Sequence, residues 1–229
     1  MVAIHPFPSD WQRALVLVPH PDDPEYGMAA AVAKWTAAGR EVRYALACRG
    51  EAGIAGMSPD QAGPIREAEQ RRSAALVGVD DLEFWDFPDS EIRNTADLRA
   101  RIGAVITQAK PDVVLSIYGG PEWAPGQPNQ RDHVEFAAAV TAAYDELAAL
   151  DHPPRWLFQN GPVPTHIEIV NGYAEVAVAA LAAHEAYLST LDPNTPVLEQ
   201  ARAVIDMTVP TLPEFGGRAV GFVLLRGPS

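Results

Sequence analysis

The sequence predicts an α/β fold with a doubly wound, mainly parallel sheet, and three observations point to it. Apolar segments alternate with helical segments from residue 13 onward, an order typical of βαβ units. The first apolar segment, 13–20, is almost continuously hydrophobic, as expected for a strand buried on both faces of a parallel sheet. Polar loops follow the first four apolar segments, at the edge where open α/β sheets bind ligands.

Seven segments have the composition of β-strands. They are rich in β-branched, aromatic or other apolar residues, and residues typical of turns separate them. The predicted strands are 13–20, 41–48, 81–88, 111–119, 155–162, 165–170 and 218–225.

Five further segments predict helices. The segment 24–39 is rich in alanine and ends at Gly39, a typical helix stop, and 64–78 carries separate apolar and charged faces. The predicted helices are 24–39, 64–78, 95–110, 132–150 and 174–190, and the Gly- and Pro-containing segments 49–63 and 119–130 are predicted loops. Neither an internal repeat nor a long linker interrupts this order, so we expect one domain over residues 1–229.

The composition excludes several classes of partner. The formal net charge of −13 argues against binding nucleic acid or an anionic membrane surface, so a small molecule is the expected partner. The single cysteine, Cys48, excludes an intramolecular disulfide and multi-cysteine zinc motifs, and it is predicted to be a small core residue. No signal-peptide pattern or long apolar run is visible, so we expect a soluble cytoplasmic protein.

Two histidines and two aspartates suggest a metal site. His20 and Asp23 follow the first strand and lie three residues apart on a tight turn, and His133 lies at another strand-to-helix junction. Two imidazoles and one carboxylate are a common ligand set for catalytic zinc, which keeps a fourth position for water. Asp22 is then placed to accept a proton from that water, and Asp132 to orient a neighbouring group.

A purely structural interpretation of the same residues is also open. Asp23 before Pro24 fits a helix N-cap followed by a proline in the first turn. Asp132 or Asn129 could cap the helix that begins near His133.

The remaining histidines carry weaker signals. His5 and His152 lie in proline-rich flanks and are expected at the surface. His166 and His184 lie at the start of a strand and in a helix, where packing or a hydrogen bond is favoured over a role in a site.

Several motifs, in order, resemble the LmbE-like, or PIG-L, zinc-dependent N-deacetylases. The resemblance covers about residues 13–190 and rests on "VPHPDDPEYGMAAAVAKW", "CRGEAG", "REAEQRRSAALVGVDDLEFWDFPD", "QRDH", "PTHIEI" and "ALAAHEAY". It implies a Rossmann-like three-layer sandwich with the site at the C-terminal ends of the strands. It also implies hydrolysis of an acetamido group on an amino sugar or its conjugate.

The resemblance assigns roles to individual positions. It implies metal ligands at His20, Asp23 and His133 and a general base at Asp22. It also implies that the substrate pocket is lined by Arg66 and, less securely matched, by Glu51 and Asp89.

One position departs from the pattern of the family. Members usually carry a histidine three residues before the last ligand, where this chain has Gln130 in "QRDH". Glutamine can donate a neutral hydrogen bond but cannot deliver a proton at neutral pH. We therefore expect Gln130 to support the tetrahedral intermediate, with Asp132 beside it and Asp22 acting as both base and acid.

The main hypothesis is a zinc-dependent N-deacetylase acting on an N-acetylated amino sugar or conjugate. One alternative is a zinc amidase for a non-sugar or thiol-conjugate amide, for which Trp85, Trp123 and Tyr118 could form an aromatic pocket; ordinary packing of these rings is favoured. Another is an inactive sugar-binding relative. Iron, cobalt or nickel would also suit the two histidines and the aspartate. The sequence leaves open whether the chain forms a homo-oligomer. A nucleotide-binding role is disfavoured, because no G-x-G-x-x-G motif follows the first strand.

Overall fold

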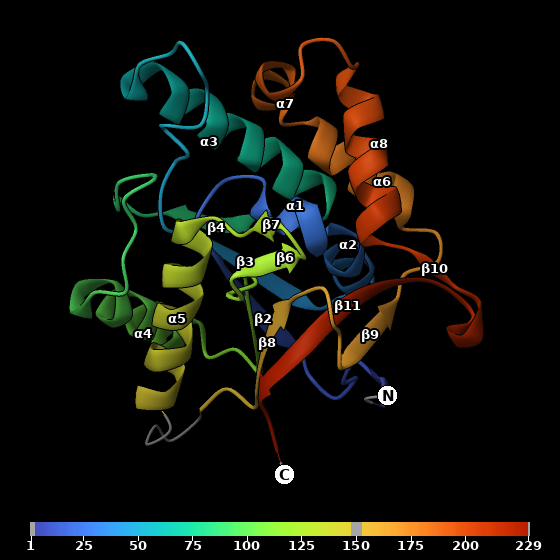
Figure 1. Ribbon diagram of the computed structural model, residues 1–229. Helices are drawn as coiled ribbons and strands as arrows, with labels where there is room; N and C mark the ends of the chain where they lie inside the picture. Colours follow the sequence, from blue (N-terminus) through green and yellow to red (C-terminus); the bar gives the residue numbers. More distant parts are fainter. Residues whose placement is uncertain (1–2, 148–152, 229) are drawn as a thin grey trace.

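A mixed sheet forms the centre of the computed structural model, which describes residues 3–147 and 153–228 (Figure 1). The strands are β1 (His5–Pro6), β2 (Arg13–Val18), β3 (Glu41–Leu46), β4 (Asp81–Phe84), β5 (Val113–Ser116), β8 (Trp156–Asn160), β9 (His166–Ile169), β10 (Thr211–Leu212) and β11 (Gly217–Arg226). Within the described residues the sheet has nine strands in the order β1-β9-β11-β8-β5-β2-β3-β4, with β10 paired to β11. Two short strands, β6 (Glu122–Ala124) and β7 (Gln127–Pro128), form a separate hairpin.

The strand order reverses next to β2. From β2 the chain proceeds outward to β3 and β4, and it then returns to the other side of β2 with β5 and β8. All of these neighbours pair in parallel. Ala14 to Val18 are buried, which explains the continuous apolar run. The carboxyl ends of β2 and β5 therefore form a topological switch point, where doubly wound sheets bind ligands.

The other half of the sheet is partly antiparallel. β11 lies between β8 and β9 and runs antiparallel to both, and β1 is parallel to β9. The predicted C-terminal strand 218–225 is confirmed as β11.

Helices cover both faces of the sheet and complete a three-layer α/β fold (Figure 1). They are α1 (Asp23–Gly27), α2 (Ala29–Ala37), α3 (Pro59–Leu76), α4 (Ala96–Ala109), α5 (Arg131–Glu146), α6 (Ala174–Ala182), α7 (Glu185–Leu191) and α8 (Val197–Thr208). α4 packs on α5, whereas α6 contacts α2, α3 and α8. The strand order reverses next to β2, and right-handed crossovers on the two sides of that point place one group of helices on each face of the sheet. The predicted α/β fold is thus confirmed.

Several predicted helix boundaries were wrong. The helix expected at 24–39 is interrupted at Met28, whose φ of −129° is not helical. α3 begins at Pro59, five residues before the predicted start, because Ser58 and Gln61 form a capping box and Pro64 lies inside the helix. The helix expected at 174–190 is interrupted at Ala183–His184, which separates α6 from α7.

Several elements were missed by the sequence prediction, among them the short strands β1 and β10. α8 was left unassigned, and the predicted loop 119–130 contains the β6–β7 hairpin. The predicted helix 132–150 ends at Glu146, and its last residues lie outside the described part of the chain.

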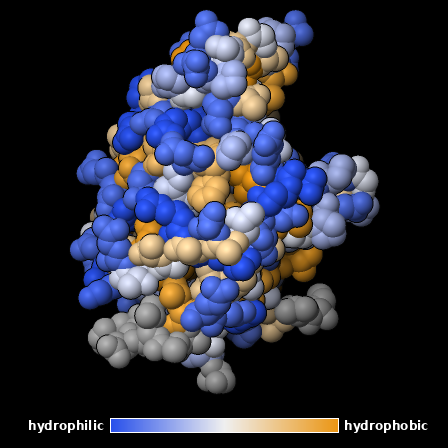
Figure 2. All heavy atoms as spheres, turned by 90° about the vertical axis from the view of Figure 1, so that its left-hand side faces the viewer, coloured by the Kyte–Doolittle hydropathy of each residue, from blue (hydrophilic) through white to orange (hydrophobic). Residues whose placement is uncertain are grey.

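The face shown in Figure 2 is largely hydrophilic, with apolar side chains scattered among polar ones. Across residues 3–147 and 153–228, no helix combines the length and apolar character needed to cross a membrane.

Candidate metal centre

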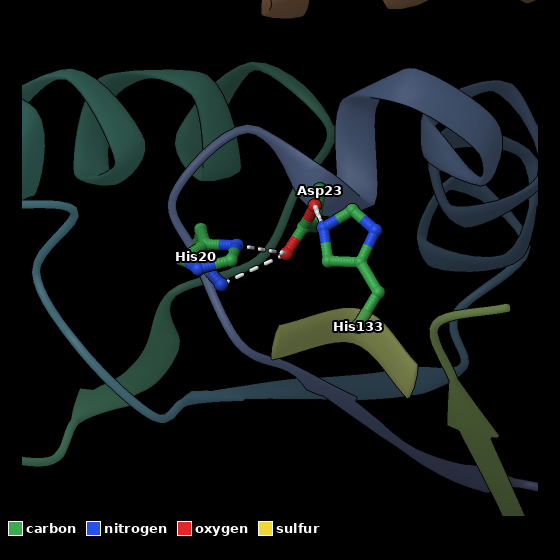
Figure 3. A group of neighbouring side chains, drawn as sticks. All are labelled: His20, Asp23 and His133. Atoms are coloured by element: carbon green, nitrogen blue, oxygen red, sulfur yellow. Dashed lines mark hydrogen bonds and ion pairs between the residues drawn. The ribbon is translucent and has the colours of Figure 1, made fainter. Parts of the chain in front are cut away.

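Two strand-to-helix junctions bring the three predicted ligands together at the switch point (Figure 3). His20 and Asp23 lie between β2 and α1, and His133 lies in the first turn of α5. One potential ligand atom from each side chain lies within 4.8 Å of the other two, and all three residues are buried. The chain thus places two imidazoles and one carboxylate around a common point.

The two nitrogens of His20 face different carboxylates. Nδ1 lies 3.5 Å from Oδ2 of Asp23, whereas Nε2 lies 3.3 Å from Oδ1 of Asp89 and 3.3 Å from Oδ2 of Asp132. Burial disfavours the charged imidazole, but the three carboxylates outweigh it and hold the pKa of His20 well above its usual range. A carboxylate that contacts one nitrogen of a metal-ligating imidazole typically fixes the orientation of the ring. Asp89 and Asp132 contact Nε2 of His20 in this way.

Asp23 contacts both histidines. Its Oδ2 accepts a hydrogen bond from the backbone N–H of His20 at 2.8 Å, and its Oδ1 lies 3.1 Å from Nε2 of His133. Burial favours the neutral acid, but the attraction of His133 and His20 prevails and lowers the pKa of Asp23. The carboxylate is therefore ionised and available as a ligand.

Asn129 fixes which nitrogen of His133 carries a proton. Its Nδ2 donates to the carbonyl oxygens of Tyr118 at 2.8 Å and Gly120 at 2.9 Å, so its Oδ1 must be the atom that faces His133. That oxygen lies 3.0 Å from Nδ1 of His133 and also accepts from the backbone N–H of Gln130 at 2.9 Å. Because Oδ1 can only accept, Nδ1 of His133 is the donor.

Nε2, the other ring nitrogen of His133, faces Asp23 and can present its lone pair to a metal ion. Within the described residues Nε2 is buried and has no hydrogen-bond partner, although Oδ1 of Asp23 lies 3.1 Å away. Two acceptors at this distance need a proton or a cation between them. The donor set, two imidazoles and a carboxylate, therefore fits a divalent metal ion.

Asp22 lies beside this centre in an unusual conformation. Its φ of 83° is left-handed, a region that few residues other than glycine adopt. Its backbone N–H donates to Oε1 of Gln70 at 2.7 Å, and its Oδ1 accepts from Nη2 of Arg66 at 3.0 Å. Burial raises the pKa of Asp22 to about 6, although the Arg66 guanidinium opposes the shift. A carboxyl group with this pKa can exchange a proton near neutral pH.

The interpretation of these aspartates as simple helix caps is wrong. Asp22, not Asp23, is the N-cap of α1, and its side chain makes no capping bond among the described residues. The N-cap of α5 is Gln130, whose side chain likewise has no capping bond in this part of the chain. The carboxyl oxygens of Asp23 and Asp132 face His20 instead.

Arg66 is placed behind Asp22 and is almost completely buried, at 3% exposure. Its Nη2 also donates to the carbonyl of Pro21 at 2.6 Å, and its guanidinium lies 3.8 Å from the ring centre of Tyr187. These contacts favour a role in holding the Asp22 turn.

Glu51 and Asp89 join two loops next to the centre. Oε1 of Glu51 accepts from the backbone N–H of Asp89 at 2.9 Å, and its Oε2 accepts from that of Arg49 at 3.1 Å. Oδ2 of Asp89 in turn accepts from the backbone N–H of Ala52 at 2.9 Å. Asp89 thus faces His20 with one oxygen and supports the loop with the other.

Gln130 lies at the surface, at the start of α5. Its side chain has no hydrogen bond to another described residue, so it is free to contact a ligand. Arg93, which the sequence analysis missed, is partly exposed and lies 3.6 Å from Oδ1 of Asp132 through Nη1.

The remaining candidates have varied placements. Cys48 is buried in the core as predicted, and burial raises the pKa of its thiol to about 12. Trp85 is buried, whereas Tyr118 and Trp123 are partly exposed, with ring centres 4.8 Å apart. His5 is exposed and His184 is buried, and His152 lies outside the described residues.

Besides Arg93, sequence reasoning missed the roles of Asn129 and Gln70. Asn129 was considered only as a helix cap, although it lies four residues before His133, one helical turn away. Gln70 lies four residues after Arg66, so both fall on one face of α3. In both cases the four-residue spacing to a predicted site residue was the signal that could have identified these side chains.

Sequence comparison identifies relatives that act on N-acetylated sugars. Diacetylchitobiose deacetylase from Thermococcus kodakarensis is 29% identical over 193 residues, which are 77% of this chain and 70% of that protein. Probable N-acetyl-alpha-D-glucosaminyl L-malate deacetylase 2 from Bacillus anthracis is 27% identical over 193 residues, 78% of this chain and 83% of that protein.

Solved structures share the fold at lower identity. N,N'-diacetylchitobiose deacetylase from Pyrococcus horikoshii has a TM-score of 0.78 and 20% identity, over 95% of this chain and 85% of that one. The 4-carboxy-2-hydroxymuconate hydratase from Pseudomonas putida has a TM-score of 0.74 and 17% identity, over 95% of this chain and 98% of that one. The fold alone therefore does not determine the reaction.

A family match spans the metal centre itself. The family described as PIG-L, GlcNAc-PI de-N-acetylase, matches residues 15–144, which include His20, Asp23 and His133. The chain belongs to the PIG-L family, also called LmbE-like, whose relatives named above are deacetylases.

Proposed function

We propose that this protein is a metal-dependent N-deacetylase that releases acetate from an N-acetylated amino sugar or its conjugate. One observation carries the metal requirement: Nε2 of His133 is buried without a hydrogen-bond partner among the described residues and faces Oδ1 of Asp23 at 3.1 Å. The relatives named above supply the substrate class, since their names describe deacetylation of N-acetylglucosamine-containing molecules.

His20, Asp23 and His133 would hold the ion. When bound, a divalent metal in such a site polarises the substrate carbonyl and lowers the pKa of water at the open position. Zinc is the preferred ion for two imidazoles and one carboxylate, although iron, cobalt and nickel suit the same ligands. Asp89 and Asp132 orient His20 from the opposite side of its ring.

Asp22 is the proton carrier in this proposal. Its carboxylate accepts a proton as water attacks the acetamide and returns it to the nitrogen of the leaving amine. Arg66 holds one oxygen of that carboxylate at 3.0 Å, which fixes its direction. The pKa of about 6, raised by burial, leaves Asp22 mostly ionised at neutral pH and still able to carry a proton.

Gln130 is the proposed donor to the oxygen of the tetrahedral intermediate. Its exposed amide is free of capping contacts with described residues and can donate a neutral hydrogen bond. Substrate contacts by Arg66, Glu51 and Asp89 stay predictions, and the hydrogen bonds that these side chains make favour a role in holding the site.

Two substitutions test the assignment. Asp22→Ala should retain the metal and lose turnover, whereas His133→Ala should lose both. Acetate release from N-acetylglucosamine conjugates and metal content are the measurements, with Asp10→Ala and His166→Ala as matched controls outside the centre. Near-wild-type acetate release by Asp22→Ala would show that the assigned base is wrong.

A second candidate changes the amide and keeps the metal. The partly exposed pair of Tyr118 and Trp123 could contact an aromatic or thiol-conjugate substrate. A panel that includes N-acetyl amino sugars and non-sugar amides separates the two candidates. If metal-loaded protein hydrolyses no member of the panel, a non-catalytic sugar-binding role is favoured instead.

A further inference from the structure

A second polar cluster lies behind Asp22, away from the three ligand atoms. Its side chains are Glu25 on α1, Gln70 on α3 and His184 at the junction of α6 and α7. Each of the three residues is completely buried, at 0% exposure. Buried polar groups are retained at a cost unless they are paired, so this cluster requires an explanation.

Gln70 connects this cluster to Asp22. Its Oε1 accepts from the backbone N–H of Asp22 at 2.7 Å, and its Nε2 lies 3.1 Å and 3.3 Å from the two carboxylate oxygens of Glu25. The backbone N–H can only donate, so Oε1 of the amide must face Asp22, and Nε2 then faces the carboxyl group of Glu25. Glu25 thus fixes the direction in which Gln70 presents its oxygen.

His184 lies next to Glu25. Its Nε2 is 3.4 Å from Oε2 of Glu25, and both side chains are fully buried. Neither ring nitrogen of His184 has a hydrogen-bond partner among the described residues, so His184 packs against the carboxyl group without bonding to it. Gln70 is therefore the described side chain that donates to Glu25.

The Asp22 backbone needs such support. A non-glycine residue at a φ of 83° is strained, and surrounding contacts must hold it there. Arg66 holds the carboxylate and Gln70 holds the amide of the same residue, and both belong to α3. The helix therefore constrains Asp22 at two points.

We propose that Gln70, oriented by Glu25, is a positioning residue that fixes the left-handed turn of Asp22 and thereby aims its carboxylate at the metal centre. The inference rests on the proposed function, because the aim of Asp22 matters only if Asp22 moves the proton. Gln70 touches neither the substrate nor the metal ligands. Its loss should therefore lower kcat while KM and metal content stay unchanged.

Gln70→Met provides the first test. Methionine keeps the length and apolar body of the side chain but removes both hydrogen bonds. We expect kcat to fall about 10- to 100-fold, the effect of a misplaced catalytic group. Glu69→Gln is the matched control: it alters the neighbouring buried side chain, whose Oε1 accepts from the backbone N–H of Ala186 at 2.6 Å and which does not contact Asp22.

The double variant Glu25→Gln with Gln70→Glu provides the rescue. A glutamate at position 70 can accept from Asp22 and from the new amide at position 25, which restores the pattern with donor and acceptor exchanged. This variant should recover kcat to within about threefold of wild type, as for a preserved geometry. Failure of a folded double variant to exceed Gln70→Met would overturn the inference.

The backbone amide of Asp22 gives a readout that is independent of activity. In NMR spectra of the wild-type protein this amide should be shifted downfield and protected from exchange, and Gln70→Met should lose both properties. Unchanged Asp22 signals, or changed signals with unchanged kcat, would each contradict the positioning role. An inactive wild type, in contrast, would count against the proposed function, while the amide signals still decide whether Gln70 holds Asp22.

Discussion

Asn129 holds His133 by a hydrogen bond from Nδ1 of the imidazole to Oδ1 of the amide, 3.0 Å long. The same amide donates to two carbonyl oxygens of the loop that precedes α5. The tautomer of a candidate metal ligand is thus set by a side chain one helical turn away.

Asn129→Ala should weaken metal binding without removing a ligand. Loss of the group that orients a ligating histidine typically lowers metal affinity about 10- to 100-fold. Competition with a chromogenic chelator measures the affinity. Asn194→Ala, in an exposed loop outside the centre, is the control and should bind the metal as wild type does. Equal affinities for Asn129→Ala and wild type would contradict the orienting role.

Metal addition should stabilise the folded protein. A ligand at about 100 times its dissociation constant contributes about 2.7 kcal/mol, which for a chain of this size corresponds to a rise in Tm of roughly 5–10 °C. Thermal unfolding of chelator-treated protein with and without added Zn²⁺ measures the shift. His133→Ala should show little of it, and an equal shift in that variant would place the ion elsewhere.

Asp22 should make the metal-free protein less stable at higher pH. Its pKa of about 6 in the folded protein lies above the ordinary value of 3.8, so the folded state binds the proton more tightly than the unfolded state does. The contribution of Asp22 to stability is therefore complete below the ordinary pKa and is lost as the pH rises through about 6.

Asp22→Asn, which cannot ionise, provides the comparison. Relative to metal-free wild type, its free energy of unfolding should increase between pH 5 and pH 8 by about 1.4 kcal/mol, since a pKa shift from 3.8 to about 6 is only partly expressed at pH 5. Denaturant titrations at both pH values measure this difference. If it is the same at pH 5 and pH 8, the raised pKa of Asp22 is refuted.

Gly53 should be intolerant of a side chain. A Cβ atom at this position would lie 2.2 Å from Nη1 of Arg66, so Gly53→Ala must displace the guanidinium that holds Asp22. We expect the acetate-releasing activity to fall at least tenfold, as for a misplaced catalytic group. Gly103→Ala is the control, because the nearest atom to its new Cβ lies 3.8 Å away and the change favours helix α4.

Cys48 should be unreactive in the folded protein. Burial raises the pKa of its thiol to about 12, so little thiolate is present near pH 8. A thiol reagent should label it only after denaturation, as followed by absorbance or mass spectrometry. Rapid labelling of the native protein would indicate that this part of the core opens.

The edge of the sheet that bears the site was predictable from local sequence patterns. The continuous apolar run before "PHPDD" identified a strand buried on both faces, and the position of the next polar loops followed from the alternation of strands and helices. His20, Asp23 and His133 could be named because each directly follows such a strand or begins the helix after it.

The supporting contacts depend on tertiary packing that no local pattern encodes. Gln70 meets Asp22 only because the fold brings its turn of α3 within hydrogen-bond distance of the start of α1, although the two residues are 48 positions apart in the sequence. Two local signals also competed at the start of α3, and the prediction of its first residue was wrong. Pro64 suggested a helix start, yet the capping box at Ser58 begins α3 one and a half turns earlier.

The left-handed turn at Asp22 sets stability against activity. Glycine adopts a φ of 83° without strain, so Asp22→Gly would relax the backbone and also remove a buried carboxyl group. Under the proposed function the same change removes the group that moves the proton. The strained backbone is therefore the condition for placing a carboxyl group at this point, beside the buried Arg66 guanidinium.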